Sequence, residues 1–506
     1  MAFVPTVGRP KDQESLLEQR VRLMEREVHD LLGMLSQAHQ KIALLEGREP
    51  QLAMDELLQS LERMEAARLE RERAQIEQDR ETVQREAEQE KKRKQPSQRG
   101  HGPRPQQALA KVEQVHELDA GTACEVCGGE LVAMGEQFEE SEEIHSIERQ
   151  YVCRVVRRRK YRCRCQACVV TAPAPPRIVP SGRYSNDFII QVAADKWLDH
   201  VPLERQSRIM DRQGVEVDSH TLYDQTEALA RLLEPVYHAL GKLTLAAPVL
   251  HADETRWPRL DAKASSNWTV WTRTTPRIAH YAILPSKSHK AAEQLFRGYQ
   301  GIIVVDGYAV YECLARDDPG LQLANCWAHV LRKFRDIEET FPKECHQILG
   351  SIGKLYEIEG KVEGAFPGDA AAQSQRLDLR RERSAPVIAE IRQWCCTSVG
   401  LPRSALGQAV RYLLKRWEAL TRFLENPQIP LDNNAAERSL RGPVIGRKVH
   451  YGSKSKRGTE VAAIFYTFFE SAKLNEVEPV AYLRAVVGQL LRGGEILLPW
   501  DFEPSI

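Results

Sequence analysis

Leu431-Asp-Asn-Asn-Ala-Ala-Glu-Arg-Ser-Leu-Arg441 is the stretch around which this 506-residue chain is organised. Prolines precede it and Gly442-Pro443 follows it, so the pattern predicts a short helix with defined ends. Asn433 is suited to cap that helix, because its side-chain oxygen can accept an unpaired backbone N–H. Asn433, Glu437 and Arg441 are four residues apart and are expected on one helix face. Alone, they would be read as a solvated polar face.

Two aspartates upstream change that interpretation, because each is predicted at the end of an apolar strand. In Ala247-Pro-Val-Leu-His-Ala-Asp253, alternate residues share one face at the period of a strand. The run Gly301-Ile-Ile-Val-Val-Asp306 is apolar up to its aspartate, as expected of a strand buried on both faces. Either aspartate alone could simply begin a turn. Together with Glu437 they could meet at the rim of a sheet and hold divalent cations through oxygen ligands.

Four separated motifs resemble those of a known protein family. They are His251-Ala-Asp-Glu-Thr255, Asp306-Gly-Tyr308, Cys326-Trp-Ala-His-Val-Leu-Arg-Lys-Phe334 and Asn433-Asn-Ala-Ala-Glu-Arg438. In this order they look like the signatures of bacterial transposases of insertion sequence family sixty-six, which are of the DDE type with a ribonuclease-H-like core. The resemblance covers most of the chain. It implies that Asp253, Asp306 and Glu437 form the catalytic triad.

The resemblance also implies an activity: binding of element ends, metal-dependent phosphodiester cleavage and strand transfer. Two magnesium ions about 4 Å apart, with manganese as an alternative, would be held by Asp253, Asp306 and Glu437, and Asp253 would bridge both ions. Arg438 and Arg441 could neutralise phosphate charge near the cut. Two other classes remain open. One is a related nuclease or recombinase, and the other is a non-enzymatic DNA-binding regulator in which the acids are structural.

Composition predicts a multidomain intracellular protein. The chain has 71 basic and 71 acidic residues, with acids concentrated in the N-terminal third and bases clustered in patches. No apolar run approaches the roughly 20 residues that span a bilayer, and no signal peptide is recognisable. Eleven cysteines without a secreted-type framework indicate a reduced cytoplasmic protein with a metal site. A protein that acts on DNA is further expected to be nucleoid-associated.

A heptad repeat predicts a coiled coil or charged helix over residues 11–94. Apolar residues recur at alternating steps of four and three from Leu17 to Leu45, which is the spacing of a coiled-coil seam. The seam favours self-association, although packing on its own chain or on small accessory proteins is an alternative. Residues 95–111 are basic and rich in Pro, Gly and Gln, which is typical of a linker.

Closely spaced cysteines predict a structural zinc site in residues 112–172. Two cysteine pairs, the first followed by two glycines, suit a tetrahedral site. The second pair is ambiguous, because Cys163 could replace either Cys165 or Cys168. A chance cluster of free thiols is the alternative. The candidate ligands are Cys124, Cys127, Cys163, Cys165 and Cys168.

Basic side chains form three candidate groups for contact with double-stranded DNA, both the terminal repeats and the target. The first lies between the cysteine pairs, the second on a predicted helix after Cys326, and the third in and after the organising stretch. Such charges bind phosphate backbones without sequence preference. The groups are Arg157, Arg158, Arg159, Lys160 and Arg162; Arg332 and Lys333; and Arg438, Arg441, Arg447 and Lys448, extended by Lys454, Lys456 and Arg457. His329, beside the second group, could orient a phosphate or a carboxylate, or simply be structural.

The predicted fold class is multidomain α/β, with a ribonuclease-H-like mixed sheet and an inserted all-helical domain. Residues 177–244 are expected to form a helix-turn-helix-like domain whose second helix, capped by Asp218, would enter a major groove, although a plain bundle fits equally well. The sheet is predicted from strands at 248–252, 268–273, 279–284, 302–305 and 321–325. The remaining predicted parts are 245–340 and 429–475 for the catalytic core, 341–428 for the helical insertion, and 476–506 for a C-terminal helical tail.

Overall fold

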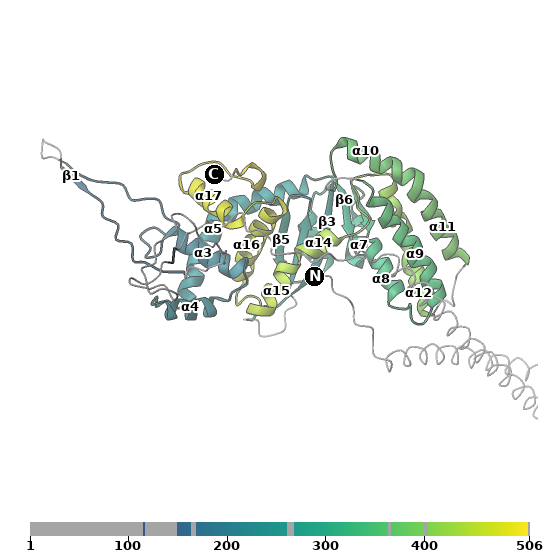
Figure 1. The fold of residues 1–506 in the computed structure, drawn as a ribbon, viewed down its shortest axis with the longest axis horizontal. Helices are drawn as coiled ribbons and strands as arrows, with labels where there is room; N and C mark the ends of the chain where they lie inside the picture. The colour runs from purple at the N-terminus through teal and green to yellow at the C-terminus, as the bar shows by residue number, and fades with distance from the viewer. Residues whose placement is uncertain are drawn as a thin grey trace, which may run out of the picture. The chain divides into compact units, whose positions relative to one another are not determined.

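A computed structural model describes residues 115–116, 149–162, 168–260, 268–362, 366–397 and 403–503. The chain divides into two compact units, Met1–Arg85 with Val155–Ile506 and, separately, Glu86–Arg154. The elements below all belong to the first unit (Figure 1). The predicted coiled coil at 11–94, the linker at 95–111 and most of the predicted zinc module lie outside the described residues.

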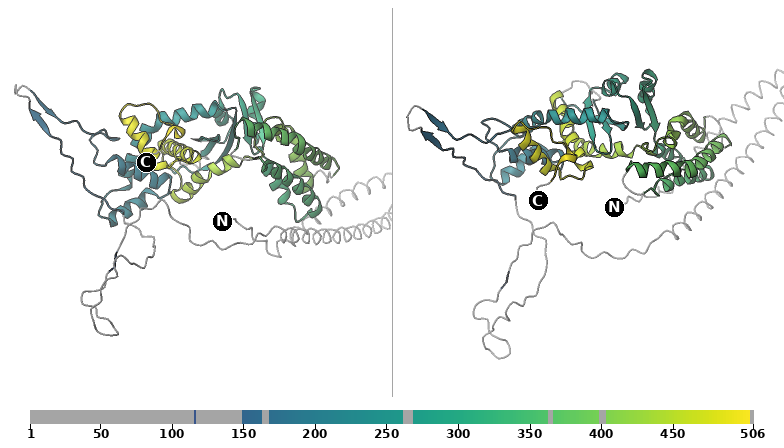
Figure 2. Two further views of the ribbon diagram at one scale, coloured as in Figure 1. Left: turned by 45° about the horizontal axis from the view of Figure 1, so that its top comes forward. Right: turned by 90° about the horizontal axis from the view of Figure 1, so that it is seen from above.

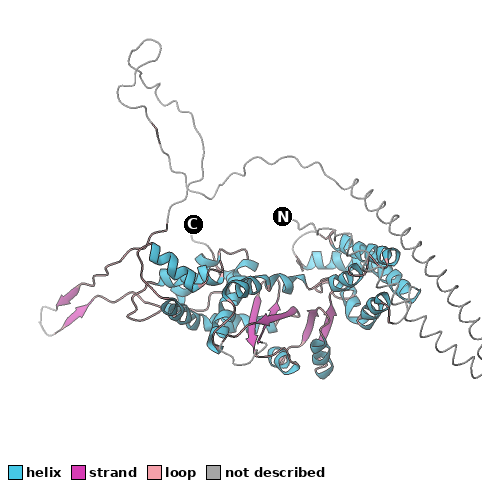
Figure 3. Ribbon diagram, turned by 90° about the horizontal axis from the view of Figure 1, so that it is seen from below, coloured by secondary structure: helices cyan, strands magenta, loops and turns pink. Residues whose placement is uncertain are grey.

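A five-stranded mixed sheet forms the core of this unit (Figure 3). Its order is β5-β4-β3-β6-β7, in which β3 is antiparallel to β4 and parallel to β6. Every residue of β4 is buried, because helices cover both faces. This confirms the predicted mixed α/β sheet and all five of its strands. The strands are β3 (Val249–Trp257), β4 (Trp268–Thr274), β5 (Ala279–Leu284), β6 (Gly301–Val305) and β7 (Leu321–Asn325).

Strand β3 is longer than predicted, so the expectation that Asp253 ends a strand was wrong. Its parallel pairing with β6 stops at His251, opposite Val304. Its antiparallel pairing with β4 continues from Asp253, opposite Thr272, to Trp257. The polar residues after Ala252 conceal this continuation, because only one neighbour supports the strand there. Asp253 therefore lies just beyond the point where β3 and β6 separate.

Helices on one face share a hydrophobic core with β4 and β5. The first and third of them begin at side-chain caps, Ser185 and Asp218, and the cap at Asp218 was predicted. The third helix runs to Leu245 because the buried residues Leu233, Val236 and Leu240 extend its apolar stripe. In chain order, the helices on this side are α3 (Asn186–Trp197), α4 (Leu203–Arg212), α5 (Ser219–Leu245), α16 (Lys456–Leu474) and α17 (Pro479–Leu491), followed by the 3-10 turn η3 (Pro499–Asp501). Helix α4 packs against α3 and α5 and contributes no residue to the shared core.

The α4–α5 pair has the order of a helix-turn-helix, with Gly214 in the turn at φ +81°. Its use in reading DNA stays a prediction. Helices α3 and α5 bury their apolar side chains in the same cluster as the sheet and α16. The predicted domain at 177–244 therefore shares its hydrophobic core with the five-stranded sheet.

Helices α6 (His289–Phe296) and α7 (Ala309–Asp317) pack in a second hydrophobic cluster with β3, β6 and β7. A third cluster joins β3, β6 and β7 to α8 (Trp327–Arg335) and to the helical insertion. Figure 2 shows the insertion beside the sheet. Its elements are α9 (Pro342–Glu359), α10 (Ala370–Leu379), the π-helical turn η1 (Arg380–Ser384), α11 (Ala385–Thr397), α12 (Ala405–Lys415), α13 (Trp417–Thr421) and the 3-10 turn η2 (Arg422–Leu424).

A buried arginine fixes the end of the insertion. The guanidinium of Arg380, which is 0% exposed, forms two hydrogen bonds with the Glu359 carboxylate, at 2.6 and 2.8 Å. It also donates to the carbonyl oxygens of Phe423, Asn426 and Ile429. Five hydrogen bonds satisfy the buried charge, so the returning chain is held in place just before the organising stretch.

The organising stretch folds differently from the prediction. Helix α14 spans only Asn434–Ser439, and Leu440 follows it. Gly442 and Pro443 lie in the first turn of the next helix, α15 (Arg441–His450), because a proline in a first turn removes no intrahelical hydrogen bond. The expected single helix from 431 to 441 is therefore wrong, and Arg447 and Lys448 are helical.

Candidate active site

Asp253 projects from β3 and is partly buried. Its Oδ1 accepts a hydrogen bond from the backbone N–H of Glu254 at 2.8 Å. Burial, followed by the charges of Glu254, Asp306 and Glu437, raises the pKa of Asp253 from 3.8 to about 7. The carboxylates of Asp306 and Glu437 thus lie within electrostatic range of Asp253, although they come from distant parts of the chain.

Asp306 follows β6 in a turn that the helical insertion supports. The Tyr308 N–H donates to Asp306 Oδ1 at 2.9 Å, and the Tyr412 hydroxyl of α12 donates to the Asp306 carbonyl at 2.6 Å. Gly307 has φ +98°, and a side chain there would also collide with Arg416. Arg416 donates to the Gly307 carbonyl at 2.7 Å. The insertion is therefore part of the structure that fixes the second acid.

The residue before α14 positions the third acid. Asn433 is fully buried, and its Nδ2 donates to the Ala252 carbonyl at 2.8 Å while its Oδ1 lies 3.0 Å from His251 Nδ1. Its backbone N–H donates to Cys326 Sγ at 3.2 Å. Asn433 does not cap α14 with its side chain. Instead it joins α14 to β3 and to the start of α8.

The expectation that Asn433, Glu437 and Arg441 share one helix face was wrong. Asn433 precedes α14, and Arg441 begins the following helix. Glu437 faces α8, where Oε1 lies 3.7 Å from His329 Nδ1 and Oε2 lies 3.8 Å from Arg332 Nη2. Neither Glu437 Oε1 nor His329 Nδ1 has a hydrogen-bond partner, although both atoms are buried. Of the three roles left open for His329, its proximity to Glu437 favours orientation of a carboxylate.

Glu254 is a buried acid whose role the sequence did not reveal. On β3 it points away from Asp253, and it forms an ion pair with Lys287 at 2.9 Å. The Tyr311 hydroxyl of α7 donates to it at 2.6 Å. Lys287 Nζ also lies 4.2 Å from the ring centroid of Tyr308, so this cluster connects β3 to the Asp306 turn. Little in the sequence indicated this role, because Lys287 lies in a polar loop that has no distinguishing motif.

The predicted basic groups differ in their surroundings. Arg332 contacts Glu437, and Lys333 Nζ lies 5.8 Å from the Tyr412 ring centroid. Arg438 is exposed, yet its charge contributes to lowering the pKa of His251. The residues Arg441 and Lys448 are exposed on α15, and Arg157, Arg158, Arg159, Lys160 and Arg162 are exposed in and before a short antiparallel ribbon of β1 (Lys160–Arg162) and β2 (Val169–Thr171).

Two of the predicted basic residues have structural partners instead. Arg447 donates to Thr255 Oγ1 at 2.9 Å and to the Arg256 carbonyl, so it ties α15 to the end of β3. Arg457 pairs with Glu227, Glu234 and Glu460 at 3.0–3.2 Å. Its place in a free basic patch was a wrong expectation, because Glu227 and Glu234, two of its three acidic partners, lie far away in sequence.

The predicted zinc ligands cannot be placed together. Cys168 is exposed, whereas Cys124, Cys127, Cys163 and Cys165 lie outside the described residues.

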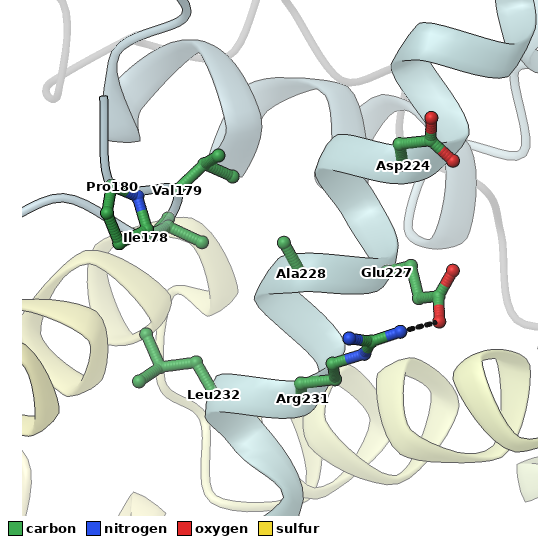
Figure 4. A pocket seen from close by; sticks show the side chains of 8 residues that line it. All are labelled: Ile178, Val179, Pro180, Asp224, Glu227, Ala228, Arg231 and Leu232. Atoms are coloured by element: carbon green, nitrogen blue, oxygen red, sulfur yellow. Dashed lines mark hydrogen bonds and ion pairs between the residues drawn. The ribbon is translucent and has the colours of Figure 1, made fainter. Parts of the chain in front are cut away.

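Elsewhere in the first unit, a groove of about 580 Å³ runs between α5 and the segment at 178–180 (Figure 4). It is lined in part by the Arg231–Glu227 ion pair, and none of the three site acids lines it. Within the described ranges, no helix is long and apolar enough to cross a membrane.

Comparison with known proteins gives one family match and several relatives. The family model described as the transposase IS66 family matches residues 181–461. The uncharacterized protein y4jD of Sinorhizobium fredii (strain NBRC 101917 / NGR234) is 31% identical over 409 residues, covering 75% of this chain and 78% of the relative. From the same organism, the uncharacterized protein y4qI is 29% identical over 433 residues, covering 80% of this chain and 78% of the relative.

Proposed function

The chain belongs to the IS66 family of transposases, and we propose that it binds the ends of its element and catalyses metal-dependent DNA cleavage and strand transfer. The observation that carries this proposal is the convergence of Asp253, Asp306 and Glu437, in which the charges of the latter two raise the pKa of the first. The strand order, with the antiparallel pair on one side of β3 and the parallel pair on the other, supports a ribonuclease-H-like core.

The donor set of this site fits divalent cations that prefer oxygen ligands. Burial and mutual repulsion raise the pKa of Asp253 to about 7, and a bound cation would relieve that repulsion. Glu437 Oε1 is buried without a hydrogen-bond partner and so retains a free lone pair. Two magnesium ions, or manganese in their place, would supply Lewis-acid activation of the attacking oxygen and stabilisation of the leaving oxygen. Asp253, Asp306 and Glu437 would hold these ions through their carboxylate oxygens.

The chain's own residues would then orient the reacting DNA. Arg332, which contacts Glu437, and the exposed Arg438 would pair with phosphate oxygens near the scissile bond. The Asn433 and Tyr412 hydrogen bonds would keep the acids fixed while the attacking group changes from water to a 3′-hydroxyl. The exposed bases at 157–162 would bind the phosphate backbone independently of sequence.

Transposition also requires two element ends to be brought together. We assign this task to self-association through residues 11–94, with small accessory proteins as further candidate partners. The zinc module would support DNA binding beside the basic residues at 157–162. Because its substrate is chromosomal DNA, the protein would work at the nucleoid in the cytoplasm.

The test uses duplex oligonucleotides that carry the inverted repeats flanking the gene. With magnesium and a target plasmid, the protein should release a 3′ end and join it to the plasmid, and a chelator should stop both steps. Cleavage without joining would indicate a nuclease. Binding of the repeats without cleavage in magnesium or manganese would indicate a regulator. Either result would contradict the proposed function.

A further inference from the structure

Three side chains of different chemistry meet beside the acidic site. Cys326 precedes α8, His329 lies in the first turn of that helix, and Glu437 comes from α14. One ligand atom from each of them, a sulfur, a nitrogen and an oxygen, lies within 4.8 Å of the other two. These are the three donor types of protein zinc sites, and magnesium avoids two of them.

The contacts around these atoms leave space for an ion rather than for a direct bond. His329 Nδ1 and Glu437 Oε1 are 3.7 Å apart, which is too far for a hydrogen bond, and both are buried without partners. Nitrogen and oxygen ligands about 2.0–2.2 Å from a tetrahedral ion are separated by roughly 3.3–3.5 Å. The observed 3.7 Å is slightly longer, so a small shift of either side chain would let both atoms bind one ion. Unsatisfied buried polar atoms that face each other in this way require such an explanation.

The thiol is also placed to act as a ligand. The Asn433 N–H donates to Cys326 Sγ at 3.2 Å. Burial raises the pKa of this thiol to about 12, and the backbone N–H groups of Asn433, His329 and Ala328 oppose that rise. On metal binding the thiol would release its proton to solvent and the sulfur would coordinate as thiolate. Three protein ligands leave a fourth tetrahedral position for water.

We propose that Cys326, His329 and Glu437 form a binding site for a zinc-like transition metal ion, separate from the all-oxygen site of Asp253 and Asp306. The two sites share Glu437. An ion on the Oε1 side would hold this carboxylate toward α8 and remove it from the oxygen-ligand set. On the basis of the proposed function, micromolar zinc should therefore inhibit strand transfer in the presence of millimolar magnesium.

The binding test needs no DNA. Full-length protein is titrated with Co²⁺, and uptake and the thiolate-to-cobalt charge-transfer absorption are compared between wild type, Cys326→Ala, His329→Ala and the matched control Cys395→Ala. Cys395 is also a buried thiol but lies in α11. Because the predicted cysteine module can also bind Co²⁺, only the difference between variants is used. Wild type and Cys395→Ala should take up one equivalent more than the other two variants, whose affinity at this site should fall at least about tenfold.

Equal uptake and equal absorption in wild type, Cys326→Ala and His329→Ala would overturn the site. If Cys326→Ala does not fold, His329→Ala decides the question, because its side chain accepts no backbone hydrogen bond among the described contacts. In a strand-transfer assay, zinc should inhibit wild type but not the activity that Cys326→Ala retains. If the wild-type protein shows no Co²⁺ binding at this site but still carries out strand transfer, only the proposed zinc site is overturned. If it binds Co²⁺ at this site but carries out no strand transfer, only the proposed function is overturned.

Discussion

His251 Nδ1 on β3 lies 3.0 Å from Oδ1 of Asn433, the residue that precedes α14. Because Asn433 Nδ2 donates to the Ala252 carbonyl, its Oδ1 must accept, and His251 therefore carries a hydrogen on Nδ1. This buried contact joins residues 182 positions apart and sets the position of Glu437 relative to Asp253. It also requires no charge on His251, whose pKa burial lowers to about 4.

The first prediction concerns acid stability. The folded pKa of His251, about 4, lies below the ordinary 6.5, so below pH 6.5 the unfolded chain binds a proton that the folded chain does not. The contribution of the neutral His251 to the free energy of unfolding is therefore fully present above pH 6.5. It is lost as the pH falls toward 4, by up to about 3 kcal/mol. Urea unfolding of wild type and His251→Gln at pH 7.5 and 4.5 should show a smaller loss in the variant. An equal loss of unfolding free energy in wild type and His251→Gln would contradict the prediction. His220→Gln, at an exposed position, is the control and should behave like wild type.

The second prediction concerns the buried Arg380. Replacing it with leucine leaves three carbonyl groups without their donor and leaves Glu359 with only its longer ion pair to Arg376, at 3.6 Å. This should destabilise the fold by about 3–5 kcal/mol. The neighbouring Arg381 side chain is 67% exposed, so Arg381→Leu should cost under about 1 kcal/mol. Thermal and urea unfolding measure both. Equal stability of the two variants would show that the Arg380 hydrogen bonds do not hold the insertion.

The apolar strands could be predicted from sequence because their patterns are local. Strands β5 and β7 have the predicted boundaries, and β6 differs by one residue. The continuation of β3 past Ala252 could not be predicted, since it depends on pairing with β4 rather than on its own polar residues. The division between α14 and α15 was missed for a similar reason. Gly442-Pro443 reads as a helix end, although a first turn also accepts proline.

The three acids of the candidate site could be predicted from the sequence, whereas the residues that hold them in position could not. Asp306 follows a recognisable strand pattern, and Asp253 lies where the apolar part of another strand ends. Glu437 was indicated by the polar spacing of the stretch 431–441, and the resemblance then assigned all three to a triad. Glu254 contacts Lys287 and Tyr311, which both lie far from it in sequence, so these buried contacts gave no local sequence signal. The same limit applies to two partners of Arg457, Glu227 and Glu234 on α5, whereas Glu460 lies three residues away on the same helix. Whether a basic side chain is available to bind DNA phosphates therefore depends on ion pairs with acids that are distant in sequence.

The third prediction concerns the cysteine pairs. Chelator-free wild-type protein should contain a tightly held zinc ion that is lost when Cys124 and Cys127 are both replaced by serine, because a tetrahedral site cannot lose two ligands. Elemental analysis after gel filtration measures it. Cys396→Ser, at an exposed position on α11, should retain the zinc. Absence of zinc from the wild-type protein would refute the module.

The fourth prediction concerns the N-terminal seam. Removal of residues 1–48 should leave a zinc-loaded protein that no longer pairs two DNA ends, because the seam from Leu17 to Leu45 is buried only by another helix. Replacing Leu31 and Leu35 with lysine should have the same effect, since two charges there cannot be buried unpaired. Light scattering at micromolar concentration measures the mass. Equal masses of full-length and truncated protein would mean that the seam does not mediate self-association.

The most direct measurement is strand transfer by Asp253→Asn in magnesium. The change keeps the size of the side chain and removes the charge that would bridge both ions, so joining should fall at least about 1,000-fold, or about 4 kcal/mol of transition-state stabilisation. Folding and binding of the terminal repeats should stay close to wild type, and Asp317→Asn, on α7, should retain activity. Joining by Asp253→Asn at the wild-type rate would contradict the assignment of the catalytic acids.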